Sequence, residues 1–203
     1  EAAACFVARK VWPLVLASFR CGLGSRRHAQ TPTLAIVGAD PTPAVRSLAE
    51  LPNVVVTGWV PSVRDWLERA QIAVAPMLGG TGIKNKILEA CAAGCPVVAT
   101  SIAVGGLPTG EDVGILTVDG PERIAAELFG LLADAARARR IGSAGLDMVQ
   151  TRFSWKQMAA AFLDVLRGGA AAPTDQDRTD REQHGTGDLH DAKTTEAFTH
   201  AHS

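Results

Sequence analysis

Short apolar runs alternate with amphipathic stretches along most of the chain. The runs are continuous, which is typical of strands buried on both faces of a parallel sheet, and they lie at 34–38, 54–57, 72–75, 96–99 and 114–118. The stretches between them have apolar residues three or four positions apart, which predicts helices at 2–20, 44–50, 63–70, 83–93, from 121 onward and at 138–150. This alternation predicts an α/β domain with a doubly wound parallel sheet.

The pattern stops near residue 168. Ser154 is the predicted N-cap of a last amphipathic helix over 155–166, and we expect one domain over 1–167. Residues 168–203 are rich in Asp, Thr, His and Gly and have almost no apolar periodicity, so this tail is predicted to be disordered. The tail spells D-x-D at 175–177 and contains four histidines, but a disordered segment gives a metal no preformed geometry. No metal site is expected.

Composition and charge narrow the classes of function. The 203 residues are 47% hydrophobic with a formal net charge of -1, which gives no electrostatic case for a nucleic-acid partner. The four cysteines lack metal-site spacing and are interpreted as reduced core residues. No apolar run approaches the roughly 18 residues of a membrane span, and no signal peptide is recognised. We expect a cytoplasmic protein without a transmembrane segment. The chain begins without Met, and a fragment is one interpretation.

A glycine-rich turn at 79–82 follows the apolar run 72–76 and precedes a predicted helix. Backbone amides gather where a strand ends and a helix begins, which is an arrangement that binds anions. In that helix Lys86 and Glu89 share one face, beside the face that turns toward the sheet. Diphosphate oxygens accept hydrogen bonds and attract cations, whereas ribose hydroxyls donate to a carboxylate. The combination predicts a nucleotide site.

Several segments carry a resemblance to a known family. They are LAIVGADPTPAV (34–45), VVVTGWVPSVRDWL (54–67), IAVAPMLGGTGIKNKILEACAAGCPVVAT (72–100), GGL (105–107) and FSWKQMAAAFLDVL (153–166). Together they resemble the carboxy-terminal nucleotide-binding domain of family 4 retaining glycosyltransferases, and most closely the bacterial enzymes of exosortase-associated exopolysaccharide systems. The resemblance implies a Rossmann-like sheet that forms one half of a GT-B fold.

The resemblance also implies roles for particular residues. Glu89 matches the second glutamate of the E-x7-E signature, which takes the ribose hydroxyls, and Lys86 is expected beside a phosphate or the ribose. Amides of Gly82 and Ile83 are expected at the donor diphosphate, and Trp59 and Val60 near the base. Thr81 falls where the first glutamate of the signature stands. No cofactor or metal is implied beyond the nucleotide-sugar substrate, and no catalytic residue is assigned.

The departures from the family pattern concern its beginning. The amino-terminal acceptor domain, the first strand of the nucleotide domain and an Arg/Lys pair that grips the diphosphate have no counterpart in this sequence, and Gly105 replaces an acidic residue. The leading hypothesis is therefore a glycosyltransferase fragment that binds a nucleotide-sugar donor for transfer to a glycan or exopolysaccharide and is inactive alone. A peripheral place at the inner membrane, through the missing half, stays open.

Two alternatives remain open at this stage. The first is a non-catalytic remnant or partner-binding module with the same fold. The second is another nucleotide-sugar enzyme such as an epimerase, but no histidine lies between Gln30 and Asp175 to serve as its acid or base.

Overall fold

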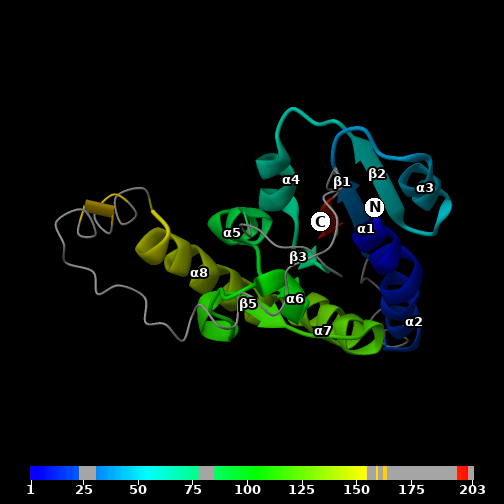
Figure 1. Cartoon of the computed structure of the whole chain (residues 1–203). Coiled ribbons are helices and arrows are strands. Elements are labelled where there is room, and N and C mark those ends of the chain that lie inside the picture. The colour runs from blue at the N-terminus through cyan, green and yellow to red at the C-terminus, as the bar shows by residue number, and fades with distance from the viewer. Residues whose placement is uncertain (23–30, 78–84, 155–158, 160–161, 164–195, 201–203) are drawn as a thin grey trace, which may run out of the picture.

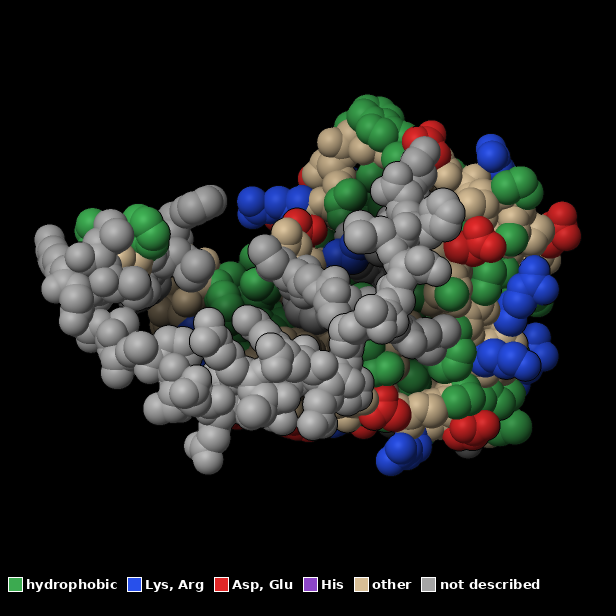
Figure 2. Space-filling view, viewed as in Figure 1, with side chains coloured by type: hydrophobic (Ala, Val, Ile, Leu, Met, Phe, Trp, Pro, Cys, Tyr) green, Lys and Arg blue, Asp and Glu red, His purple; other side chains and the backbone are tan. Residues whose placement is uncertain are grey.

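The computed structural model describes residues 1–22, 31–77, 85–154, 159, 162–163 and 196–200. Within these ranges the chain forms one six-stranded sheet with helices on both faces (Figure 1). The α/β class and the doubly wound arrangement predicted from the sequence are confirmed. Side chains of both charge signs are interspersed over the end of the molecule that holds α1, α2 and α3 (Figure 2).

The sheet has the strand order β2-β1-β6-β3-β4-β5. The pairs β1–β2, β3–β4 and β4–β5 are parallel, whereas β6 is antiparallel to both of its neighbours. The strands span Thr33–Val37 (β1), Val54–Gly58 (β2), Ile72–Ala75 (β3), Val97–Ala99 (β4), Ile115–Thr117 (β5) and Glu196–His200 (β6).

The structure differs from the sequence prediction at β6. Its five residues belong to the segment 168–203, which was expected to be disordered, and they add an antiparallel strand to a sheet that was expected to be parallel. The rest of that segment lies outside the described residues. Short-range patterns did not predict this strand because its partners, β1 and β3, lie far away in the sequence.

Most helices agree with the predicted positions, with shifts of a few residues at their ends, whereas the short helices α6 and η3 were not predicted. Thr42 and Ser62 cap two of them, because each hydroxyl accepts a hydrogen bond from the backbone N–H three residues later. The helices are α1 (Ala2–Phe6), the π-helical turn η1 (Val7–Val11), α2 (Trp12–Gly22), α3 (Pro43–Arg46), η2 (Ser47–Glu50), α4 (Val63–Arg69), α5 (Asn85–Ala92), α6 (Ser101–Val104), η3 (Glu111–Val113), α7 (Pro121–Ala133) and α8 (Ala135–Arg152). Most of the helix predicted at 155–166 lies outside the described residues.

Two apolar clusters, one on each side of the sheet, make the core. Strand residues alternate between them, so that Leu34 and Ile36 join one cluster and Ala35 and Val37 the other. The first cluster includes the helical segment from α1 to α2 and much of α7, and the second includes α4, α5 and α6. Each fully buried Val, Leu or Ile side chain contributes about 1.5–3 kcal/mol to folding.

Among the described residues one helical segment, Ala2–Cys21, is long and apolar enough to cross a membrane. It is not a continuous apolar run, because Arg9, Lys10 and Arg20 interrupt its apolar residues. In the structure its Val11 and Trp12 are buried in the first core cluster. The segment therefore packs as a core helix of the domain.

Candidate functional site

The five parallel strands direct their carboxyl ends to one edge of the sheet. The connections that follow β1, β2 and β4 begin at this edge, as do the described residues 76–77 after β3. In open α/β sheets ligands bind outside the carboxyl ends of the strands. This edge is the candidate functional site.

Helix α5 presents its polar residues as the sequence predicted. Ile87, Ala90 and Cys91 are buried, whereas Glu89 is exposed to solvent. Lys86, one turn before Glu89, is half-buried and its Nζ is shielded from solvent. The carboxylate is therefore accessible to a ligand, while the ammonium lies deeper in the surface.

Close contacts between backbones fix the position of α5. The helix ends at Ala92, and Gly94 follows with φ +72°, a left-handed conformation that favours glycine. A Cβ atom on Gly142 of α8 would overlap the Gly94 carbonyl oxygen, so α8 can approach this turn only with a glycine there. Gly145, one turn later, lies close to Cys91 and Gly114, where a Cβ atom would come within 3.3 Å of each residue. α8 thus holds α5 against the sheet at backbone distance.

Thr100 links the segment after β4 to the segment after β3, at the carboxyl edge of the sheet. It is the one buried polar residue among the described residues, and its Oγ1 donates a 2.7 Å hydrogen bond to the Met77 carbonyl oxygen. Met77 is the last described residue before the glycine turn. Thr100 therefore fixes the start of that turn. Sequence reasoning missed it, because a threonine at a strand end has many other uses.

Asp119 has a similar role one strand further along. Its carboxylate accepts a 3.0 Å hydrogen bond from the Ser101 backbone N–H, and hydrogen bonds from the backbone and side chain of Ser101 hold the pKa of Asp119 below its usual value. The carboxylate thereby connects the segment after β5 to the beginning of α6. Neither contact was predicted from the sequence.

Trp59 and Val60 follow β2 and differ in burial. Val60 is partly buried against the second core cluster, which also contains Ile87 of α5. Trp59 is 73% exposed, a high value for the largest apolar side chain. The Trp59 side chain therefore contributes little to the core.

Three predicted site residues, Thr81, Gly82 and Ile83, lie outside the described residues, as do Gly79 and Gly80. The described ends of this connection are Met77 and Asn85. The proposed amide arrangement thus stays a prediction. The structure describes Lys86, Glu89, Trp59 and Val60, and it associates Val60 with α5 through the shared core cluster.

Cys91 and Cys95 are buried, and burial raises the pKa of each thiol to about 12. Metal ligation needs the thiolate, so these groups behave as small apolar core residues. Among the described ranges, no three His, Cys, Asp or Glu side chains gather in a way that could hold a metal ion.

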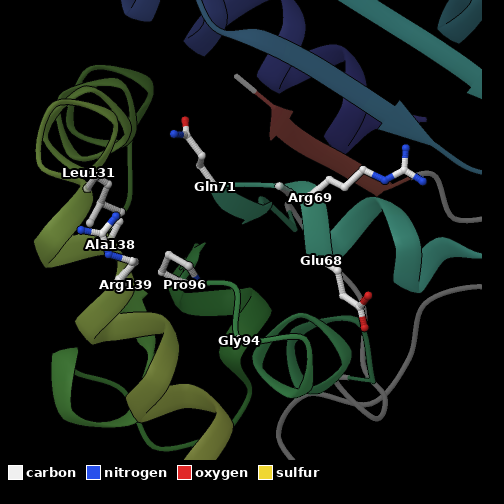
Figure 3. Close-up of a pocket in the computed structure, with 10 residues that line it drawn as sticks. Glu68, Arg69, Gln71, Gly94, Pro96, Leu131, Ala138 and Arg139 are labelled. Atoms are coloured by element: carbon white, nitrogen blue, oxygen red, sulfur yellow. The ribbon is translucent and has the colours of Figure 1, made fainter. Parts of the chain in front are cut away.

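A separate pocket of about 270 Å³ opens at the opposite edge of the sheet (Figure 3). Gln71 and Pro96, which line it, immediately precede β3 and β4, and residues of α4, α7 and α8 complete the wall. Because it lies at the amino ends of the strands, this pocket does not belong to the candidate site.

The fold defines the class, a doubly wound α/β domain; in domains of this class ligands bind where the strands end. The chain belongs to the family described as glycosyl transferases group 1, whose sequence profile matches residues 3–134.

Curated relatives agree with this family. A D-inositol 3-phosphate glycosyltransferase of Segniliparus rotundus is 45% identical over 94 residues, which cover 42% of this chain and 20% of the relative. A GDP-mannose-dependent alpha-(1-6)-phosphatidylinositol monomannoside mannosyltransferase of Mycobacterium tuberculosis is 39% identical over 95 residues, covering 45% and 24%. The matches thus span only about a fifth to a quarter of the relatives' length.

A solved structure shows the same fold. It is the crystal structure of the C-terminal domain of a glycosyl transferase group 1 family protein from Francisella tularensis, with a TM-score of 0.50 and 17% sequence identity. The match covers 72% of this chain and 80% of that domain. The expected likeness to one GT-B half is thereby supported at the level of the fold.

Proposed function

We propose that this chain is the donor-binding half of a retaining glycosyltransferase and that it holds a nucleoside-diphosphate sugar for transfer to a glycan or exopolysaccharide acceptor. The observation that carries the proposal is the face of α5. Glu89 is exposed one turn after Lys86, on a helix that begins directly after the connection from β3. Membership of the glycosyl transferases group 1 supports the reaction class.

The chemistry follows from the charges. The Glu89 carboxylate accepts hydrogen bonds from the ribose hydroxyls, and bonds to an ionised acceptor are stronger than neutral ones. The Lys86 ammonium stabilises the departing diphosphate, together with amides of Gly82 and Ile83 at the beginning of the helix. Its shielded position favours this role, since a cation out of bulk water interacts more strongly with an anion.

The base is proposed to lie near Trp59 and Val60. An exposed indole offers a flat apolar surface on which a base can stack. Thr81, in place of a glutamate, leaves the donor sugar without an acidic contact at that position. Because the Mycobacterium tuberculosis relative is named for GDP-mannose, guanosine diphosphate is the first donor nucleotide to test.

We expect the chain by itself to bind the donor without turnover, since no residue of this sequence is assigned to the acceptor or to a catalytic base.

A cytoplasmic location also belongs to the proposal. Its four cysteines are all free, and reduced thiols persist in the cytosol.

Calorimetric titration with GDP, UDP and ADP tests the proposal. We expect saturable binding of one nucleotide, and Glu89→Ala weakens it more than tenfold, about 1.4 kcal/mol or more. Glu50→Ala is the matched control, because Glu50 is also exposed but lies just before β2, at the other edge of the sheet. Equal affinity of the Glu89→Ala and wild-type chains removes Glu89 from the site.

A non-catalytic partner-binding module is the second candidate. It is favoured by two exposed apolar side chains, Val55 on the edge strand β2 and Trp59 just after it. Edge strands and exposed apolar patches are common contact surfaces. The same titration distinguishes the two, because this module binds none of the three nucleotides.

A further inference from the structure

Strand β6 occupies a slot in the middle of the sheet. It pairs with all five residues of β1 on one side and with three residues of β3 on the other, antiparallel to both. In Figure 1 it is the red strand beside β1. Among the described strands no ladder joins β1 directly to β3. β6 is therefore the element that unites the pair β2–β1 with the group β3–β4–β5.

The walls of the slot are buried. Leu34, Ala35, Ile36 and Val37 of β1 are at most 1% exposed, and β3 is buried from Ile72 to Val74. Buried backbone N–H and C=O groups need hydrogen-bond partners, because leaving one unpaired costs the full desolvation of that group. Along these two strand edges the described partners are supplied by residues 196–200.

The two ladders give β6 a single register. Phe198 pairs with Ala35 of β1 and Ala73 of β3, and Ala197 pairs with Ile36 and Val74. Residues 197–199 are therefore paired on both sides.

β6 is also the last of the described strands in sequence order. It comes after α8, while the other five strands lie within residues 33–117. In the common doubly wound order 3-2-1-4-5-6, the position between strands 2 and 4 belongs to the first strand of the fold. In this chain β1 and β3 border that position, and the strand that fills it runs in the opposite direction.

We propose that the slot between β1 and β3 is a peptide-binding site that takes an extended strand, with the segment around residues 196–200 as its resident. Main-chain hydrogen bonds along the edges of β1 and β3 provide the affinity, as in recognition by strand addition. The site accepts the same segment when it is supplied as a separate peptide. This inference does not rest on the proposed nucleotide binding.

A disulfide cross-link in the full chain tests whether residues 196–200 lie beside β1. Thr33 pairs with His200, so T33C/H200C is expected to form an intramolecular disulfide in a chain whose Cys5 and Cys21 are replaced by serine. T57C/H200C is the control, because Thr57 is on β2, which is not a neighbour of β6. Adding Ala197→Pro to T33C/H200C should abolish the link, since proline cannot donate to the ladder. A link no more frequent than in the control overturns the proposal.

A second experiment tests whether a separate peptide can take the place of β6 in the sheet. A chain ending at Lys193 is mixed with the peptide TTEAFTHAHS, residues 194–203. We expect truncation to lower the Tm by more than about 10 °C, or to unfold the chain. We expect the peptide to restore the Tm or the circular-dichroism signal and to bind at least tenfold more tightly than its Ala197→Pro version. A truncated chain that the peptide neither binds nor stabilises overturns the exchangeable site.

Discussion

Two regions of the domain are held in different ways. Around β1 and β2, large side chains fill the space, and Trp12 is buried with its Nε1 donating a 3.1 Å hydrogen bond to the Pro52 carbonyl oxygen. Around α5, glycines of α8 let backbones touch, and one face of the helix is left to solvent. The first region contributes most to stability. In the second region, close backbone packing fixes the position of α5 and therefore of its polar residues Lys86 and Glu89.

The largest expected effect comes from removing Trp12. Trp12→Ala leaves a cavity in the first core cluster and is expected to cost about 3–5 kcal/mol of unfolding free energy, measured in urea. The nucleotide affinity of the folded fraction should not change, because Trp12 packs in the first core cluster, whereas α5 packs in the second, on the other side of the sheet. Leu14→Ala, at a half-exposed position of α2, is the control and should cost much less. A large loss of nucleotide affinity in the folded Trp12→Ala chain would contradict the division into two regions.

A smaller effect with a different signature is expected at Gly142. Gly142→Ala places a Cβ against the Gly94 carbonyl oxygen, and backbone has to move, at a cost of about 1–3 kcal/mol. Because Gly94 ends the turn after α5, nucleotide affinity should fall as well. Gly130→Ala is the control: its Cβ would meet only the end of Arg137, and alanine is the better helix former by about 1 kcal/mol. Equal stability of the Gly142→Ala and wild-type chains would show that the close contact is dispensable.

Thr100→Val is expected to have the smallest effect on folding, about 0.5–1.5 kcal/mol, because the part-buried Met77 carbonyl oxygen loses its donor while the side-chain shape is kept. Its effect on nucleotide affinity should be larger than its effect on stability, since Met77 begins the turn that the diphosphate is proposed to contact. Thr100→Ser, which keeps the hydroxyl, should restore affinity. Unchanged affinity in Thr100→Val would separate this hydrogen bond from the site.

The sequence predicted the parallel strands and most helices because each is encoded locally, by an apolar run such as 34–38 or by a cap such as Ser62. It predicted the faces of α5 for the same reason, and Ile87 is buried and Glu89 exposed as expected. It missed β6, whose residues Glu196–His200 form a strand only between partners far away in the chain.

Contacts between elements were equally hidden from the sequence. In the sequence Gly142 is only a poor helix former, and its close contact with Gly94 is visible only in the structure. The role of Thr100 likewise depends on its hydrogen bond to Met77. The π-helical turn Val7–Val11 was not predicted either; Pro13, which lacks a backbone N–H, follows it two residues later. Long-range packing decides these features, and local propensity does not report on it.

The most direct test of the central claim is a double-mutant cycle between Glu89 and the ribose. The affinities of GDP and 2′,3′-dideoxy-GDP, or of whichever nucleotide binds, are measured by calorimetry for the wild-type chain and for Glu89→Ala. If the carboxylate holds the ribose, removing the hydroxyls weakens binding about tenfold or more in the wild type and has little effect in Glu89→Ala. An equal loss in both chains would contradict the assignment of Glu89 to the ribose.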